Sequence, residues 1–154
     1  MTSSRPLIFL VEDSPTLALL YKDYLRSEPY DVVHFPLGLP VLDQLEKQLP
    51  QVVLLDLELP DISGMEILRF INERHIPCTV VVVTAHGSVD IAVDAMRQGA
   101  FDFLTKPFDG KRLCATVRNA VKHQQLTYLV ETYRANYDRS EFGGFLGSSL
   151  PMQG

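Results

Sequence analysis

The sequence predicts an α/β domain: a five-stranded parallel sheet, doubly wound, with helices on both of its faces. Short apolar runs alternate five times with segments whose apolar residues recur at helical spacing, which is the pattern of successive strand–helix units. Such alternation favours right-handed crossovers and therefore a parallel sheet. In addition, residues 52–55 read VVLL, a run typical of a strand that is buried on both sides.

The five strands are expected where these apolar runs occur. The fourth is the clearest because every residue in it is β-branched, and such stiff side chains suit a pleated sheet. The second is the weakest, since polar residues interrupt it. The predicted ranges are 7–11, 31–35, 52–57, 79–83 and 101–105.

Five helices are expected between and after the strands. The first begins after an N-cap at Ser14, with Pro15 in its first position. The second and third are expected at 37–48 and 64–74, and the fourth begins after a cap at Ser88. The apolar positions that mark the first, fourth and fifth helices are Leu17, Leu20, Tyr21, Tyr24 and Leu25; Val89, Ala92, Val93 and Met96; and Leu113, Val117, Ala120 and Val121.

The composition is that of an ordinary globular protein. The chain has 154 residues, enough for one domain and a tail, with 46% hydrophobic and 21% charged residues. Its net charge of −5 disfavours a nucleic-acid surface on this segment, because phosphate binding requires clustered Lys and Arg. With no long apolar run and no signal-peptide pattern at the start, we expect a cytoplasmic protein without membrane contact. Cys78 and Cys114 lie in apolar patterns without metal-ligand spacing and are expected to be reduced core thiols.

Charged and polar side chains stand at the carboxyl ends of four predicted strands. Glu12 and Asp13 follow the first strand, Asp56 lies near the end of the third, Thr84 follows the fourth and Lys106 follows the fifth. With strand one central and strands three, four and five to one side of it, these groups converge at the edge where such sheets bind ligands. Neighbouring carboxylates repel one another, and Mg²⁺, which takes oxygen ligands and keeps several waters, would relieve that repulsion.

This arrangement predicts a metal-assisted phosphoryl-transfer site. Asp56 is the expected nucleophile on phosphorus, while Glu12 and Asp13 are expected to hold Mg²⁺ directly or through water. The Lys106 ammonium and the Thr84 hydroxyl are expected to interact with oxygens of the transferring group.

Each of these residues also has a purely structural explanation. A single aspartate at a strand end often forms a turn or caps a helix, and Glu12 with Asp13 could simply begin a helix that its dipole favours. Thr84 could be an ordinary strand residue and Lys106 a solvated charge. The combination favours chemistry, because all of these groups fall at strand ends of one α/β pattern.

Four motifs occur in the order and at the spacing of a known family, and together they resemble the receiver domain of two-component response regulators over residues 7–123. The resemblance implies a flavodoxin-like sheet with strand order 2-1-3-4-5. It also implies a phosphoacceptor that assists its own phosphorylation and dephosphorylation, rather than an enzyme. The motifs are FLVEDSP, VVLLDLELPDISGMEIL, VVVTAHGS and GAFDFLTKPF.

The resemblance assigns roles to the same strand-end residues. It implies that Asp56 accepts a phosphoryl group from a histidine on a sensor kinase or a histidine phosphotransfer protein. Glu12 and Asp13 match the acidic metal pair, Thr84 matches the switch hydroxyl, and Lys106 matches the lysine that contacts the phosphoryl group.

Further positions match the family's metal site and its switch. The backbone carbonyl of Glu58 would be another Mg²⁺ ligand, and Phe103 occupies the aromatic switch position that responds to Thr84. The Lys106–Pro107 step resembles one that is commonly cis in the family. The sequence departs from the common pattern in having Glu rather than Asp at position 12 and Phe rather than Tyr at position 103. Glu58 and His86 flank the expected site entrance, and we expect them to tune the lifetime of the phosphoryl group.

The stretch from Thr84 to Phe108 resembles receivers of the NtrC class, which activate sigma-54-dependent transcription, including quorum-sensing regulators. FLGSSLPMQ near the end resembles the start of their AAA+ ATPase domain. We therefore expect a receiver domain at 1–123, a linker helix and connection at 124–141 that becomes irregular from 136, and a truncated AAA+ start at 142–154. No phosphate-binding loop motif occurs, so ATP hydrolysis is not expected of this segment.

The expected partners follow from this class. They are the phosphodonor protein, the downstream AAA+ and DNA-binding domains of the full-length chain, and a second copy in a homodimer. The signal would leave through a face at 88–122 whose outward residues include Asp90, Arg97 and Lys111.

Three other interpretations remain open. The first is an Mg²⁺-dependent phosphatase of the haloacid-dehalogenase type, although its motif requires a second Asp where Glu58 stands. The second is a Toprim-like Mg²⁺ site, which leaves Thr84 and Lys106 unexplained. The third is a pseudo-receiver that binds partners without phosphate.

Overall fold

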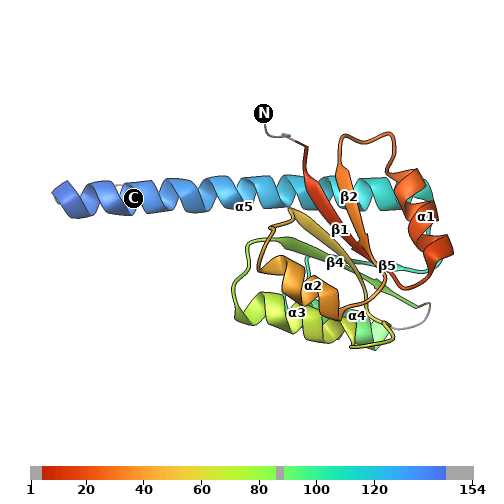
Figure 1. Cartoon of the computed structure of the whole chain (residues 1–154). Helices are drawn as coiled ribbons and strands as arrows, with labels where there is room; N and C mark the ends of the chain where they lie inside the picture. The colour runs from red at the N-terminus through yellow and green to blue at the C-terminus, as the bar shows by residue number, and fades with distance from the viewer. Residues whose placement is uncertain (1–4, 86–88, 145–154) are drawn as a thin grey trace. The chain divides into compact units, whose positions relative to one another are not determined.

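The structure, a computed structural model, describes residues 5–85 and 89–144 and confirms the predicted α/β fold (Figure 1). Five strands form one parallel sheet in the order β2-β1-β3-β4-β5. The strands are β1 (Leu7–Val11), β2 (Asp31–Phe35), β3 (Val52–Asp56), β4 (Thr79–Thr84) and β5 (Asp102–Thr105). The helices are α1 (Pro15–Tyr24), α2 (Leu39–Leu45), α3 (Gly64–Glu73), α4 (Val89–Arg97) and α5 (Gly110–Gly144).

Alternate residues of each central strand face different core layers. In β1, Ile8 and Leu10 pack in the layer that holds α1 and the first part of α5, while Phe9 and Val11 pack in the layer that holds α2, α3 and α4. Figure 1 shows α1 on one side of the sheet and α2, α3 and α4 on the other. Every residue of β3 and β4 is buried, as expected of parallel strands covered on both faces. Polar chemistry is therefore confined to the strand ends.

The start of α1 is as predicted, and α2 is shorter than predicted. Ser14 caps α1 by accepting a hydrogen bond from the amide of Leu17 at 3.2 Å, and Pro15 is in the first turn. α2 covers 39–45 rather than 37–48, because Gly38 stands at its N-cap and the chain turns at its other end. The amides of residues 38 and 39 donate to the carboxylate of Asp61, at 2.9 and 2.7 Å, and hold this short helix beside the β3–α3 loop.

The packing face of α4 differs from the predicted apolar stripe. Ala92, which is part of that stripe, and Ala95 are buried, whereas Val89, Val93 and Met96 are exposed at 66%, 46% and 40%. The small alanine side chains fill the contact with the sheet, so the larger apolar residues of this helix face outward. The predicted cap at Ser88 lies outside the described residues.

The last helix continues further than predicted. The chain divides into two compact units, 1–124 and 125–154, and α5 extends through the described part of the second to Gly144. The expectation of irregular structure at 136–141 was wrong, because no proline and no glycine interrupts the helix before residue 143. The segment expected to begin an ATPase domain lies almost entirely outside the described residues.

A buried polar contact holds the end of the first unit. The Thr79 hydroxyl donates to Oε1 of Gln124 at 2.8 Å, and Nε2 of Gln124 donates to the carbonyl of Pro77 at 2.8 Å. This contact ties α5 to the start of β4, at the opposite end of the sheet from the predicted site. The two cysteines are free thiols and only half-buried, so neither is a full core residue. None of the helices in the described ranges is both long and apolar enough to cross a membrane.

Gly64 fixes the distance between α3 and the end of β3. Its amide donates to the carbonyl of Leu57 at 3.0 Å, and a Cβ at this position would meet the carbonyl oxygen of Asp56 and lie 2.7 Å from Cα of Leu57. These are backbone atoms of the segment that carries the predicted nucleophile, so they cannot rotate away. A side chain at position 64 would therefore displace that segment.

We expect Gly64→Ala to lower the free energy of unfolding by about 2 kcal/mol, within the range for overpacked interiors. Urea unfolding of the metal-free protein, followed by circular dichroism, measures this. Gly38→Ala is the matched control, because the atoms nearest to a Cβ there belong to the flexible side chains of Ile62, Ile67 and Leu59 rather than to the backbone. Equal losses for the two variants would contradict this explanation.

Candidate functional site

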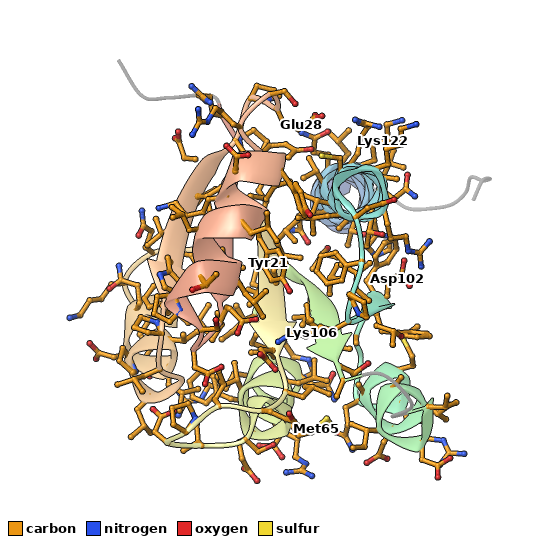
Figure 2. The ribbon with its side chains drawn as sticks, turned by 90° about the vertical axis from the view of Figure 1, so that its right-hand side faces the viewer. Tyr21, Glu28, Met65, Asp102, Lys106 and Lys122 are labelled. Carbon is orange, nitrogen blue, oxygen red and sulfur yellow. The ribbon has the colours of Figure 1, made fainter. Side chains whose placement is uncertain are left out.

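The predicted site residues gather at the carboxyl ends of the central strands. Asp56 is the last residue of β3, and Glu12 and Asp13 directly follow β1. Lys106 follows β5, and its side chain extends toward this end of the sheet (Figure 2). Asp56 and Glu12 are only 4% and 1% exposed, so their carboxylates are largely removed from water. Such burial is unfavourable unless charged or hydrogen-bonding partners compensate it.

Lys106 supplies part of that compensation. Its Nζ donates to Oδ2 of Asp56 at 3.0 Å and lies 3.1 Å from Oε1 of Glu12. Burial alone would lower the pKa of the ammonium, but its contacts with Asp56 and Glu12 outweigh burial and raise that pKa to about 12. Lys106 is therefore a permanent positive charge at this site.

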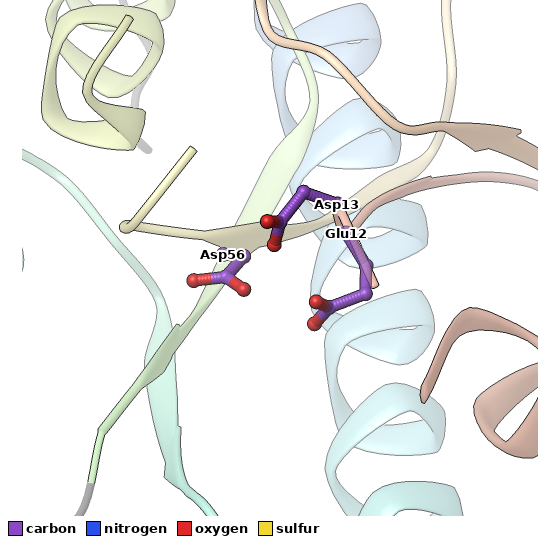
Figure 3. A group of neighbouring side chains, drawn as sticks. All are labelled: Glu12, Asp13 and Asp56. Carbon is purple, nitrogen blue, oxygen red and sulfur yellow. The ribbon is translucent and has the colours of Figure 1, made fainter. Parts of the chain in front are cut away.

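Three carboxylates form a compact group of oxygen ligands. One oxygen from each of Glu12, Asp13 and Asp56 lies within 4.8 Å of the others, and Figure 3 shows the three side chains around one small space. Burial, together with the smaller effect of the Asp56 charge, raises the pKa of Glu12 to about 7, although the Ser14 amide and Lys106 act to lower it. Near neutral pH, a proton on Glu12 therefore competes with a cation for this group of carboxylates.

The group fits a hard divalent cation. Oε2 of Glu12 accepts a hydrogen bond from the amide of Ser14 at 3.1 Å, whereas its buried Oε1 accepts no hydrogen bond from any described residue. The ion pair between Oε1 and Lys106 is its one charged contact given by the structure. A buried oxygen with unused acceptor capacity beside two further carboxylates suits Mg²⁺, which prefers oxygen ligands and retains water.

Asp56 is held in one orientation through both of its oxygens. Oδ1 accepts a hydrogen bond from the amide of Glu58 at 2.9 Å, and Oδ2 accepts the one from Lys106. The side chain of Glu58 is exposed and is not one of the three grouped carboxylates. The expected role of Glu58 as a ligand concerns its backbone carbonyl and stays a prediction.

The two predicted switch residues lie on neighbouring strands. Thr84 is 3% exposed at the end of β4, and its hydroxyl donates to the carbonyl of Leu104 in β5 at 3.5 Å, a long bond. Phe103 is half-buried and packs against the core layer on the α2–α4 side of the sheet. The Thr84 hydroxyl therefore bonds to β5 rather than to Asp56 among the described residues. The Lys106–Pro107 bond is cis, as expected.

Two histidines are relevant to the surroundings of the site. His86, expected to flank the entrance, lies outside the described residues. His34 was not predicted: its Nε2 lies 2.7 Å from the carbonyl oxygen of Glu12. This contact is difficult to predict from the sequence, because His34 and Glu12 are 22 residues apart and lie at the ends of two different strands.

The raised pKa of Glu12 makes metal binding depend on pH. A divalent cation requires the ionised carboxylate, which dominates at pH 8 and is the minor form at pH 6 when the pKa is about 7. We expect Mg²⁺ affinity to fall about tenfold from pH 8 to pH 6. Titrations of amide chemical shifts with Mg²⁺ at several pH values measure this, with Glu12→Gln as the control that should lose the dependence.

The same shift has a consequence for the metal-free domain. Because the folded pKa lies above the ordinary value of 4.5, ionising Glu12 opposes folding. The protonated Glu12 side chain stabilises the fold below pH 4.5, and this contribution is lost as the pH rises through about 7. The Mg²⁺ titration also tests the pKa itself. If the wild-type protein bound Mg²⁺ with the same affinity at pH 6 and pH 8, Glu12 would be ionised throughout this range and the raised pKa would be refuted.

Comparison with known proteins agrees with this geometry. Residues 8–118 match the model of the response regulator receiver domain. The chain is 41% identical to the regulatory protein LuxO of Vibrio cholerae over 145 residues. This alignment covers 94% of this chain and 31% of LuxO. It is 35% identical over 121 residues to the DNA-binding transcriptional regulator NtrC of Escherichia coli, covering 79% of this chain and 26% of NtrC. The chain thus spans about a third or less of the length of these curated relatives.

Solved structures show the same similarity. The signal receiver domain of a LuxO repressor protein from Vibrio parahaemolyticus superposes with a TM-score of 0.79 at 47% identity, covering 82% of this chain and 98% of that one. NtrX from Brucella abortus superposes with a TM-score of 0.78 at 28% identity, covering 95% of this chain and 32% of that one. The chain therefore belongs to the response regulator receiver domains, in the group that includes LuxO and NtrC.

Proposed function

We propose that Asp56 accepts a phosphoryl group from a phosphohistidine on a sensor kinase or a histidine phosphotransfer protein. The observation that carries the proposal is a buried carboxylate at the end of β3, held between an acidic pair and the Lys106 ammonium. A domain of this family is a signalling module and not an enzyme in its own right. Each Asp56 is accordingly modified once per signalling event.

The transfer requires little from the protein beyond position and charge. A carboxylate oxygen of Asp56 attacks phosphorus in line, a P–O bond forms, the P–N bond breaks, and the electron pair leaves with the donor imidazole. Lys106 stays beside the phosphoryl oxygens, and the Thr84 hydroxyl exchanges its long bond to β5 for one of those oxygens. Glu12, Asp13, Asp56 and the carbonyl of Glu58 would hold Mg²⁺, which would supply positive charge to the transferring group.

The output lies in domains beyond this segment. Because the chain spans only about a third of LuxO, we propose that it regulates an attached AAA+ domain and a DNA-binding domain, as one step of a quorum-sensing phosphorelay. The predicted output face at 88–122 supports this, since Asp90, Arg97 and Lys111 are exposed and free to contact another domain or a second copy. The exchange of the Thr84 bond would shift the populations of two arrangements of that face.

Replacing the acceptor tests the proposal directly. We expect the chain, incubated with Mg²⁺ and acetyl phosphate, to gain one acid-stable, base-labile phosphoryl group by intact mass, and Asp56→Asn to gain none. Asp43→Asn is the matched control, because this carboxylate is exposed on α2 and, within the described ranges, forms its ion pair with Lys47, away from the site. Repeated hydrolysis of unrelated phosphate esters would instead indicate a phosphatase, and an absence of both adduct and Mg²⁺ binding would indicate a pseudo-receiver.

The lifetime of the phosphoryl group is expected to depend on Glu58. Its side chain is exposed, while its amide is bonded to Asp56, so the carboxylate can hold a water molecule near the phosphoryl group. We expect Glu58→Ala to lengthen the half-life of the aspartyl phosphate, measured by its decay after removal of the donor. His86→Ala is to be compared in the same assay; half-lives equal to that of the parent in both variants would refute the tuning role.

A further inference from the structure

His34 holds the backbone of the acidic pair from a neighbouring strand. Its Nε2 lies 2.7 Å from the carbonyl oxygen of Glu12. A carbonyl oxygen can only accept, so Nε2 carries the proton. His34 stands opposite Leu10 in the β1–β2 register, and its half-buried ring therefore reaches past the end of β1 to the residue that begins the metal-binding pair.

The ring replaces a backbone donor that the fold does not supply. The amide of Glu12 donates to the carbonyl of Phe35 at 3.0 Å, which continues the parallel ladder one residue beyond β1. The ladder would next need the amide of residue 37, but β2 ends at Phe35, so no residue of β2 donates its amide to the Glu12 carbonyl. His34 supplies the donor for that carbonyl, and the Glu12 residue is thus fixed to β2 through both its N–H and its C=O.

We propose that His34 is a positioning residue for the metal site, acting through the backbone of Glu12 and Asp13. The inference rests on the proposed function, because it takes the grouped carboxylates to be the Mg²⁺ ligands. Two of the three come from consecutive residues just past a strand end, where the chain lacks the support of a ladder on both sides. The Glu12 carbonyl belongs to the peptide bond that joins these two residues. Holding it in place keeps the carboxylate oxygens of Glu12 and Asp13 within 4.8 Å of that of Asp56 before any cation binds. Groups that orient metal ligands in this way typically contribute between tenfold and a hundredfold to affinity.

The test compares replacements that keep or remove the donor at the position of Nε2. His34→Gln retains an amide N–H of similar reach, His34→Asn carries the same group one bond shorter, and His34→Leu has no donor. Val33→Thr is the matched control, because Val33 is the adjacent, partly exposed residue of the same strand, stands opposite Phe9 and points to the other face of the sheet. Mg²⁺ alone is the probe, titrated against amide chemical shifts of the whole chain, and thermal unfolding without Mg²⁺ verifies that each variant folds.

We expect His34→Leu and His34→Asn to bind Mg²⁺ about tenfold more weakly than wild type, and His34→Gln and Val33→Thr to bind within about twofold. With acetyl phosphate, the Mg²⁺ concentration for half-maximal phosphorylation should rise in His34→Leu while the rate at saturating Mg²⁺ is unchanged. If the role of His34 were merely structural, His34→Leu would also lower the rate at saturating Mg²⁺, and His34→Gln would not restore Mg²⁺ binding.

Two results would overturn the proposal: Mg²⁺ binding by a folded His34→Leu that equals wild type, or binding by His34→Gln as weak as that of His34→Leu. If His34→Leu does not fold, the comparison of Gln with Asn decides the question in the same way. Wild type that binds Mg²⁺ but forms no adduct on Asp56 would refute the proposed function alone, because the binding titration still measures the effect of His34.

Discussion

One ammonium shared between two buried carboxylates is the interaction on which this domain depends. Asp56 and Glu12 are brought to the same end of the sheet by strands that are hydrogen-bonded neighbours, and both are almost fully buried. Without Lys106, two like charges would face each other where water cannot solvate them, a situation that usually costs several kcal/mol. The excess negative charge that remains, with Asp13 beside it, suits this group of carboxylates to a divalent cation.

The fold makes this concentration of charge possible by keeping it at one edge. β3 and β4 are buried along their whole length, so they tolerate only apolar side chains or small hydroxyls until they end. The close contact at Gly64 then brings α3 against the backbone of Asp56 and Leu57, which fixes the position of Asp56. The polar side chains of the candidate site thus lie at the strand ends, apart from the apolar side chains that form the core layers. We expect a substitution among these polar residues to leave the core packing intact.

Much of this could be predicted from sequence because it depends on short-range patterns. Apolar runs and β-branched residues located the strands, and Ser14 with Pro15 located the start of α1. The motifs, through their resemblance to a family, gave the strand order. Four of the predicted residues, Glu12, Asp13, Asp56 and Lys106, do meet at one point.

What could not be predicted depends on contacts between distant segments or on competing local preferences. The bond from His34 to Glu12 requires knowledge of how far a ring reaches past a strand end. The bond from the Thr84 hydroxyl to β5 depends on one rotamer, which sequence does not specify. The helix through 136–144 continues because nothing in its sequence stops it, although its polar composition resembles that of a connection.

The way α4 is attached has a consequence for the motion of the domain. The two side chains that this helix buries are alanines, so sliding it along the sheet exposes little apolar area, worth about 1 kcal/mol or less for each methyl group. A helix held by leucines would have to break interlocking contacts before it moved. α4 instead buries two alanines, while Val89, Val93 and Met96 face outward, so we expect it to shift more readily than such a helix. α4 is also the helix that follows β4, whose last residue is Thr84.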